Sequence, residues 1–205
     1  MKLWYSPPSP FARKVRVAAI ELGLAERIEL VLMPVVPIEP NPALVAQNPL
    51  VKLPTLEAED GAVLYDSRTI CEYLDALAGG GRLFPPSGPA RWDALRRQAL
   101  GDGIMDAGIL RRYELVLRPE ALRWSEWLRG QQAKIDYALD AAERDAGRWK
   151  DERAFDIGHV TLACALGWLD FRFGDYDWRA KRGALGAWYA HARRRPSLAQ
   201  TMPAS

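Results

Sequence analysis

The segment LWYSPPSPFARKVR, at residues 3–16, holds the pattern that decides the fold. Its first three residues are apolar and lead into a proline-rich run, which is typical of a short buried strand that ends in a loop. Ser9 is a favourable N-cap, and Pro10 is a favourable first residue of a helix. Apolar residues then recur at helical spacing as far as Leu22, and Gly23 ends the helix. The segment therefore predicts a strand, a loop and a helix, in that order.

The residues that follow complete a small mixed domain. Further strands are predicted from short apolar runs at residues 28–32, 55–57 and 62–64. Asp60-Gly61 separates the last two runs and predicts a β-hairpin. Residues 33–49 are rich in proline and are predicted to be irregular, with at most one turn of helix. Asp66 or Ser67 then caps a helix that runs to about Leu77. The order β-α-β followed by β-β-α is that of a thioredoxin-like sheet.

A linker is predicted at residues 79–89, where three consecutive glycines are followed by three prolines. Glycine and proline at this density neither continue a helix nor form a central strand. The first, α/β domain accordingly covers residues 1–78, and the second covers residues 90–205. The second domain is predicted to be all-helical, with helices at about residues 90–117, 120–146, 156–169 and 178–195. The third of these helices is apolar nearly all round, so we expect it at the centre of the domain.

Composition excludes several classes of protein. The chain has 205 residues, of which 49% are hydrophobic and 26% charged, the balance of a globular protein rather than a disordered or fibrous one. Residues 1–80 carry a net charge of −3 and the remainder +5, which gives +2 for the whole chain. This net charge is too small to indicate nucleic acid or an anionic membrane as a partner.

The compartment is predicted from the cysteines and from the apolar runs. Cys71 and Cys164 lie far apart in apolar segments, which excludes a disulfide scaffold and fits a reducing compartment. The N-terminus has no apolar run of signal-peptide length, and the longest uncharged stretch, Ile157–Leu169, is too short to span a bilayer. We therefore predict a soluble, cytoplasmic protein with no membrane partner.

The whole chain resembles the bacterial glutathione transferases, in particular the serine-type cytosolic members. The resemblance rests on residues 5–16, on Asn48-Pro49 followed by KLPTL at residues 52–56, on Tyr65-Asp66-Ser67 and on Phe171-Arg172-Phe173. It implies a thioredoxin-like N-terminal domain that binds glutathione, and an all-helical C-terminal domain that contributes the site for an electrophile. It also implies glutathione as the co-substrate and a homodimer.

Ser9 is the predicted catalytic residue. The oxygen of an N-cap serine accepts a hydrogen bond from a backbone N–H, which leaves the hydroxyl proton for an acceptor outside the helix. The resemblance implies that this acceptor is the glutathione thiolate. A thiol has an unperturbed pKa of about 8.5, and a hydroxyl donor at the positive end of a helix lowers it. A purely structural role as a cap is the alternative, and Ser6 is the second candidate for the contact with the thiolate.

The resemblance assigns the rest of the glutathione site to two further segments. It implies a cis peptide bond between Leu53 and Pro54, which presents the Leu53 backbone to an extended peptide ligand. It places the γ-glutamyl carboxylate at Ser67, because a helix N-terminus with a free hydroxyl and open N–H groups binds carboxylates. Many relatives carry Glu in place of Asp66, whose shorter side chain weakens the expected contact with the ligand's ammonium group. Ordinary helix capping and an ordinary loop proline are the structural alternatives.

The site for the second substrate carries no recognisable motif. By resemblance, the first helices of the second domain line this site, and the candidate lining residues are Met105, Ile109 and Tyr113. Trp124 and Trp127 are predicted to be core residues instead. Solvated charge on a helix face is the predicted role of Arg13, Lys14 and Arg16.

Two departures from the family pattern carry structural predictions. His159 stands where relatives have Asp, three residues after the N-cap Asp156, so we expect the reciprocal acceptor of the capping box to be lost. Val51 stands where glycine is frequent, which reshapes the loop under the ligand. His159 and His191 are far apart and have no carboxylate spacing around them, so no metal site is predicted.

Three functions are compatible with this family resemblance. The leading prediction is an enzyme that conjugates glutathione to small hydrophobic electrophiles. A thiol-disulfide or reductive transferase on the same fold needs a nucleophilic cysteine at the head of the first helix, where this chain has Ser6 and Ser9. A non-catalytic protein-binding or stress-response module is the remaining alternative, although such a module has no need of Ser9, Pro54 and Ser67 together.

Overall fold

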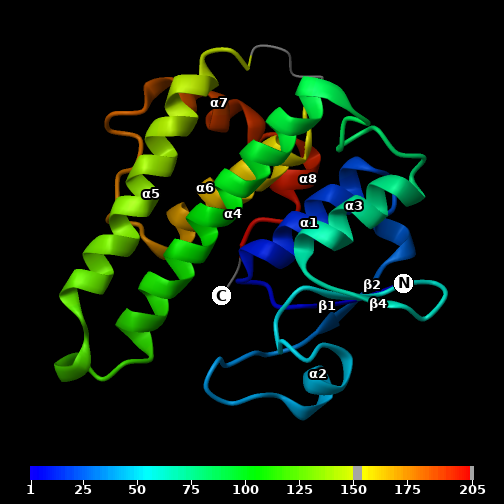
Figure 1. Ribbon diagram of the computed structural model, residues 1–205, viewed down its shortest axis with the longest axis horizontal. Helices are drawn as coiled ribbons and strands as arrows, with labels where there is room; N and C mark the ends of the chain where they lie inside the picture. The colour runs from blue at the N-terminus through cyan, green and yellow to red at the C-terminus, as the bar shows by residue number, and fades with distance from the viewer. Residues whose placement is uncertain (150–153, 204–205) are drawn as a thin grey trace. The chain divides into compact units, whose positions relative to one another are not determined.

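The computed structural model describes residues 1–149 and 154–203. The chain divides into two compact units (Figure 1). The first unit consists of Met1–Trp92 together with the chain from Pro196 onward, and the second consists of Asp93–Arg195. The sequence predicts a second domain that extends to residue 205, so the return of the chain to the first unit is a difference from that prediction.

The first unit is built on a four-stranded sheet in the order β2-β1-β3-β4. Its strands are β1 (Lys2–Tyr5), β2 (Glu29–Leu32), β3 (Thr55–Glu57) and β4 (Val63–Leu64). β1 is parallel to β2 and antiparallel to β3, and β3 is antiparallel to β4. This topology confirms the predicted thioredoxin-like domain.

Helices cover both faces of this sheet (Figure 1). On one side lie α1 (Pro10–Glu21) and α3 (Ser67–Leu77), and on the other lies the short α2 (Pro42–Gln47). The unit also contains the 3-10 turn η1 (Ala25–Arg27) and the C-terminal α8 (Pro196–Ala199). Trp4 of β1 and Leu44 of α2 are buried in one cluster with Met33. The internal strand β1 is therefore shielded from water at Trp4, whereas the edge strand β2 keeps Leu30 and Leu32 exposed.

The second unit is helical throughout its regular structure. Its elements are α4 (Gly88–Val116), the 3-10 turn η2 (Glu120–Leu122), α5 (Ser125–Ala146), α6 (Ile157–Arg172) and α7 (Gly183–Ala192). α6 is buried over Ile157–Leu169, which confirms that the helix with apolar residues all round lies at the centre. The described residues thus confirm an all-helical C-terminal part after a mixed N-terminal one.

Two of the predicted helices are shorter than expected. The helix predicted from residue 120 begins at Ser125, because Trp124 is extended and donates its N–H to the Glu114 carboxylate at 2.8 Å. The helix predicted from residue 178 begins at Gly183. Turns precede it, and the Glu143 carboxylate accepts the N–H groups at the start of α7. Both starts are set by side chains distant in sequence.

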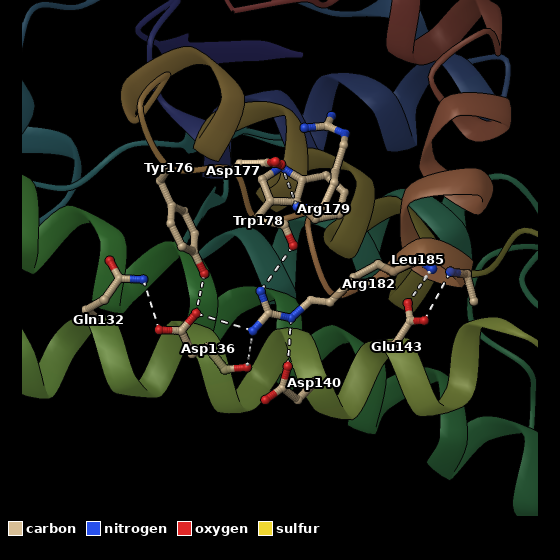
Figure 2. A network of polar contacts seen from close by, with 11 residues as sticks. Gln132, Asp136, Asp140, Glu143, Tyr176, Asp177, Trp178, Arg179, Arg182 and Leu185 are labelled. Carbon is tan, nitrogen blue, oxygen red and sulfur yellow. Dashed lines mark hydrogen bonds and ion pairs between the residues drawn. The ribbon is translucent and has the colours of Figure 1, made fainter.

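Carboxylates on α5 hold the chain between α6 and α7 (Figure 2). Asp136 accepts a hydrogen bond from the Tyr176 hydroxyl, and Arg182 donates to Asp140 at 2.7 Å. Arg182 also donates to the Trp178 carbonyl at 3.1 Å. Since Asp136 and Asp140 are one helical turn apart, they lie on one face of α5. Both therefore bind the segment between α6 and α7.

α4 and α6 approach each other closely. A Cβ atom at Gly158 would lie 2.6 Å from the Ala94 carbonyl oxygen, and one at Gly108 would lie 2.5 Å from the Trp168 ring. Neither position accommodates a side chain without displacing its neighbour. Glycine at these two positions therefore lets the central helix pack directly against α4.

Candidate functional site

The three segments predicted to bind glutathione lie at the same end of the sheet. β1 and β3 are antiparallel with Trp4 opposite Thr55, so the loop that carries Ser9 leaves β1 beside the loop that precedes β3. β3 and β4 are antiparallel with Leu56 opposite Leu64, so the chain leaves β4 at this same end. Strand register therefore gathers the N-termini of α1 and α3 and the loop before β3.

Ser9 is the N-cap of α1, as predicted. Its Oγ accepts a hydrogen bond from the Ala12 N–H at 3.2 Å, and its own N–H donates to the Ser6 carbonyl at 2.9 Å. Within the described residues, the Ser9 hydroxyl donates to no acceptor. The first turn of α1 has no acidic side chain to neutralise the positive end of the helix. Both the hydroxyl proton and the helix dipole are thus available to an anion.

The Leu53–Pro54 peptide bond is cis, as the resemblance implies. The loop around it is braced by the buried side chain of Asn48, whose Nδ2 donates to the Lys52 carbonyl and to Thr55 Oγ1, each at 3.0 Å. Among residues 1–149 and 154–203, the Leu53 N–H and C=O have no hydrogen-bond partner. These two backbone groups are therefore available to pair with an extended ligand.

Asn48 and Thr55 are positioning residues to which sequence analysis assigned no role. Thr55 donates its hydroxyl proton to the Lys52 carbonyl at 2.9 Å, so both side chains hold the same loop. Both residues belong to the segment that carries the family resemblance, Asn48-Pro49 followed by KLPTL at residues 52–56, and this was the only sign of their role in the sequence. Val51, in the same loop, has φ of 52°, a left-handed backbone that β-branched residues rarely adopt. Glycine at this position would adopt that backbone without steric cost.

Asp66, rather than Ser67, caps α3. The Asp66 Oδ1 accepts a hydrogen bond from the Arg68 N–H at 2.9 Å, and Ser67 is the first helical residue. The Ser67 side chain is buried, and its hydroxyl has no hydrogen-bond partner in the described part of the chain. The peptide bond between Tyr65 and Asp66 is cis. The end of α3 thus offers an unengaged hydroxyl and helix N–H groups beside an exposed carboxylate.

The candidate residues for the second substrate lie along one stripe of α4. Met105, Ile109 and Tyr113 are spaced by four residues, which places them on one face. Met105 is fully buried, whereas Ile109 is half-buried and Tyr113 is 37% exposed. Burial raises the pKa of Tyr113, and the nearby positive charge of Arg112 opposes this shift. Their role as lining residues stays a prediction, with Ile109 and Tyr113 as the members that reach the surface.

Trp124 and Trp127 are not core residues, which corrects the prediction. They are 60% and 36% exposed, and their rings stack on each other with centroids 6.5 Å apart. Trp127 lies on the same helical face as Gln131 and Ile135, where the buried part of α5 begins. The apolar face of α5 extends toward the N-terminus beyond the part that neighbouring residues bury. The spacing of apolar residues along the sequence therefore could not show that Trp127 is exposed.

Arg13 and Lys14 are buried, so the prediction of solvated charge is wrong for both. The Arg13 guanidinium donates to the Leu198 carbonyl at 3.0 Å and to Thr201 Oγ1 at 3.4 Å. The chain that returns from Pro196 covers this face of α1 and supplies these acceptors. The burial of Arg13 therefore follows from a contact between the two ends of the chain.

The capping box of α6 is present, which overturns the predicted loss of its reciprocal acceptor. The Asp156 carboxylate accepts the His159 N–H at 3.1 Å, and His159 Nδ1 lies 3.4 Å from the Asp156 N–H. An imidazole nitrogen thus takes the place of the expected carboxylate oxygen. Burial by itself raises the pKa of Asp156, but the hydrogen bonds and charges of His159 and Arg97 outweigh it, so the pKa is lowered.

Three further observations concern the part of the chain that the structure describes. Residues 1–149 and 154–203 contain no group of three or more His, Cys, Asp or Glu placed to hold a metal ion. No helix among them is both long enough and apolar enough to cross a bilayer. Cys71 and Cys164 are fully buried, in α3 and α6 respectively.

Comparison with known proteins agrees with this geometry. Residues 8–77 match the N-terminal domain of glutathione S-transferases, and residues 125–191 match the C-terminal domain. An uncharacterized GST-like protein of Escherichia coli strain K12, YibF, is 31% identical over 205 residues, which cover 99% of this chain and 98% of the relative. The chain belongs to the glutathione S-transferase family. Its place among the bacterial members was predicted from the motifs alone and is confirmed.

Solved structures of bacterial members of the family share the whole fold. A glutathione transferase family member of Pseudomonas fluorescens Pf-5 with bound glutathione is 44% identical, with a TM-score of 0.95 over 100% of this chain and 99% of the other. A Pf-5 structure with bound S-(propanoic acid)-glutathione is 42% identical, with a TM-score of 0.90 over 100% of both chains. A Methylobacillus flagellatus KT transferase with glutathione bound is 35% identical, with a TM-score of 0.87 over 99% of both chains.

Proposed function

We propose that this protein binds glutathione at the end of the sheet where the N-termini of α1 and α3 meet the loop before β3. We propose that it activates the glutathione thiol for conjugation to small hydrophobic electrophiles. The observation that carries the proposal is the hydrogen bonding of Ser9. Its oxygen is engaged by the Ala12 N–H, while its proton has no acceptor among the described residues. A ligand atom at the positive end of α1 can accept a hydrogen bond from this hydroxyl. A negatively charged atom there is also stabilised by the helix dipole.

The proposed chemistry follows from the pKa of the thiol. Glutathione is mostly protonated at neutral pH, because an unperturbed thiol has a pKa of about 8.5. Serine is too weak a base to remove the proton, so Ser9 acts by donating its hydrogen bond to the thiolate. Stabilising the thiolate raises its fraction at neutral pH, and the thiolate is the nucleophile. The thiol proton is released to solvent.

The remainder of the tripeptide would be held by backbone groups and by α3. The Leu53 N–H and C=O, which lack partners in the described chain, suit antiparallel pairing with the cysteinyl residue. The Ser67 hydroxyl and the N–H groups at the start of α3 suit the γ-glutamyl carboxylate, and Asp66 suits its ammonium group. The relatives with bound glutathione support this assignment.

The acceptor substrate is assigned to the helical unit, with Ile109 and Tyr113 of α4 as surface candidates and Met105 behind them. The relative with bound S-(propanoic acid)-glutathione supports a family site that takes S-substituted glutathione. We also propose a homodimer in the cytoplasm with a role in detoxification, by resemblance to the family. A monomeric mass in light scattering across micromolar concentrations and moderate salt would contradict the dimer.

Thiol-disulfide chemistry is less well supported than conjugation. It needs a nucleophilic cysteine at the head of α1, where this chain has serine, and both Cys71 and Cys164 are fully buried. A non-catalytic module has a weaker case, since it requires neither a donor hydroxyl at Ser9 nor available backbone groups at Leu53.

Two measurements test the proposed function. The full chain is applied to glutathione resin and eluted with free glutathione, and is then assayed for conjugation of chlorodinitrobenzene. Ser87→Ala, in an exposed segment before α4, serves as the control for Ser9→Ala. Retention with turnover that falls only in Ser9→Ala supports the proposal. Retention without turnover favours the non-catalytic module, and no retention contradicts glutathione binding.

A further inference from the structure

Three half-buried arginines of the second unit have no acidic partner among the described residues. Arg111 and Arg112 lie on α4, and Arg172 is the last residue of α6. No carboxylate lies within ion-pair or hydrogen-bond distance of them in residues 1–149 and 154–203. By contrast, an aspartate pairs with each of three other arginines of this unit, Arg97, Arg179 and Arg182. We call Arg111, Arg112 and Arg172 the arginine cluster.

Aromatic rings orient two of the three arginines, Arg111 and Arg172. The Arg111 guanidinium lies over the Phe173 ring, 4.4 Å from its centroid, and the Arg172 guanidinium lies over Phe171 at 4.1 Å. Phe173 itself packs edge-on against Trp168, with centroids 5.7 Å apart. α4 approaches the Trp168 ring closely at Gly108, and the next turns of α4 and α6 carry Arg112 and Arg172. The Arg111 and Arg172 guanidinium groups are therefore oriented by stacking rather than by ion pairs.

This arrangement is unfavourable for the isolated protein. Burial lowers the pKa of Arg172, and the positive charge of Arg112 lowers it further. The Arg172 Nε is buried and has no hydrogen-bond partner in the described structure. Burial likewise lowers the pKa of Arg111. Half-buried cations that lack an anionic partner carry a cost that an anion would relieve, and such costs are concentrated at functional sites.

A simple structural role does not account for the arginine cluster. A cation in the last turn of a helix is stabilised by the helix dipole, which fits Arg172 at the end of α6. However, Arg172 donates to no carbonyl of that turn in the described structure. Arg112 is half-buried four residues before the end of α4 and brings a second positive charge toward Arg172. The dipole does not explain why these two cations are neighbours.

We propose that the arginine cluster binds a carboxylate group of the acceptor substrate, so that the preferred electrophiles are anionic. A guanidinium presents paired N–H donors that match the two oxygens of a carboxylate. Arg112 is three residues from Ile109 and therefore lies on the stripe of α4 assigned to the acceptor. The inference rests on the proposed function, which places the acceptor substrate on α4. It adds that this substrate is negatively charged.

The test compares two electrophiles that differ only in charge, para-chloro-meta-nitrobenzoate and its carboxamide. In both, the glutathione thiolate forms a C–S bond at the carbon that bears chlorine, and chloride leaves with the electron pair of the C–Cl bond. No oxidant or reductant is needed. Each enzymatic kcat/KM is divided by the uncatalysed rate constant, which removes the intrinsic difference in reactivity. We expect the normalised value to be about ten-fold or more higher for the benzoate than for the carboxamide. This is the ratio expected from one hydrogen bond to a charged group.

Charge-removing variants locate the effect. Arg112→Gln and Arg172→Gln should each abolish most of the preference for the benzoate, with the carboxamide reaction and the KM for glutathione unchanged. Arg112→Lys should retain part of the preference, because it keeps the charge but loses the paired donors. Arg144→Gln, at an exposed position of α5, removes the same charge and should change nothing. A preference that survives both glutamine variants, or a rise only in the KM for glutathione, overturns the inference.

A binding measurement separates this inference from the proposed function. Without glutathione, the benzoate should raise the Tm of the wild-type chain more than the carboxamide does, and Arg112→Gln should remove the difference. If neither electrophile is conjugated but this difference is seen, the proposed function fails and the anion site stands. Inorganic phosphate at equal concentration serves as the test for a general anion site. An equal Tm increase with phosphate, or no difference between benzoate and carboxamide, overturns the proposal.

Discussion

His159 Nδ1 lies 3.0 Å from the Oδ1 of Asp156 and 3.4 Å from the backbone nitrogen of the same residue. One ring nitrogen cannot donate to the carboxylate and accept from the amide at the same time. With a proton, Nδ1 donates to the carboxylate; without one, it accepts from the N–H. In both forms the imidazole ties the first turn of α6 to its N-cap, and Arg97 holds the same carboxylate from α4.

We expect Asp156→Ala to destabilise the second unit strongly. The variant loses the cap of α6, and it leaves Arg97, whose side chain is only 12% exposed, without its partner. The free energy of unfolding in urea should fall by about 2–4 kcal/mol. Asp156→Asn also removes the charge that pairs with Arg97 but keeps an oxygen for the His159 N–H, so it should lose about 1 kcal/mol less than Asp156→Ala. Equal losses in the two variants would show that the capping bond contributes nothing.

The lowered pKa of Asp156 predicts a loss of stability in acid. Its folded-state pKa lies below the unfolded value of 3.8, so the folded state favours the ionised form. This contribution is present above pH 3.8 and is lost as the pH falls through the folded-state pKa. Urea unfolding measured from neutral pH down to about pH 3 should show a shallower decline for Asp156→Asn than for wild type. A slope equal to that of the wild type would contradict the assignment.

Ser9→Ala should raise the pKa of bound glutathione by about one to two units, each worth about 1.36 kcal/mol. Conjugation at neutral pH should fall about ten- to a hundred-fold, and part of the loss should return as the pH rises. Glutathione affinity should change little, and unfolding should become easier by about 1 kcal/mol because the cap is lost. Ser9→Cys should lose conjugation and gain mixed-disulfide chemistry with glutathione. Full activity of Ser9→Ala with an unshifted pH profile would leave Ser6 or a backbone N–H to hold the thiolate.

Ser67→Ala should weaken glutathione binding without destabilising α3. The cap of this helix is Asp66, so removal of the Ser67 hydroxyl leaves the capping bond intact. Loss of one hydrogen bond to a charged carboxylate should raise the KM for glutathione about ten-fold or more. Steady-state kinetics with varied glutathione, with Ser87→Ala as the control, measures this change. An unchanged KM would place the γ-glutamyl carboxylate elsewhere.

Tyr176 should be among the last tyrosines to ionise. Burial, together with the hydrogen bond to Asp136, raises the pKa of Tyr176 from 10.0 to about 12. Because the folded-state pKa is the higher one, its contribution to stability is complete below pH 10.0 and is lost as the pH rises toward about 12. Alkaline absorbance titration of Tyr176→Phe should lack this late step, whereas Tyr137→Phe, at a position 73% exposed, should retain it. A late step in both variants would refute the assignment to Tyr176.

Much of the fold was predictable because its signals are local. Ser9 and Asp156 start their helices through hydrogen bonds that span three residues, so a short stretch of sequence contains both partners. The continuous apolar run at Ile157–Leu169 requires burial on every side wherever the helix is placed. The cis bond before Pro54 was expected only from the resemblance to the family, which is carried by residues 52–56.

The tertiary structure alone decided which distant groups meet. Arg13 is buried because the chain returns after Pro196, far away in sequence, and Trp127 is exposed because the covering of α5 ends before it. Strand register, which depends on pairing between segments up to about fifty residues apart, brings Ser9, Leu53 and Ser67 to one end of the sheet. Local preferences are set by bonds within a few residues and can be read along the chain. Burial and convergence depend on contacts whose partners are specified only when the whole chain has packed.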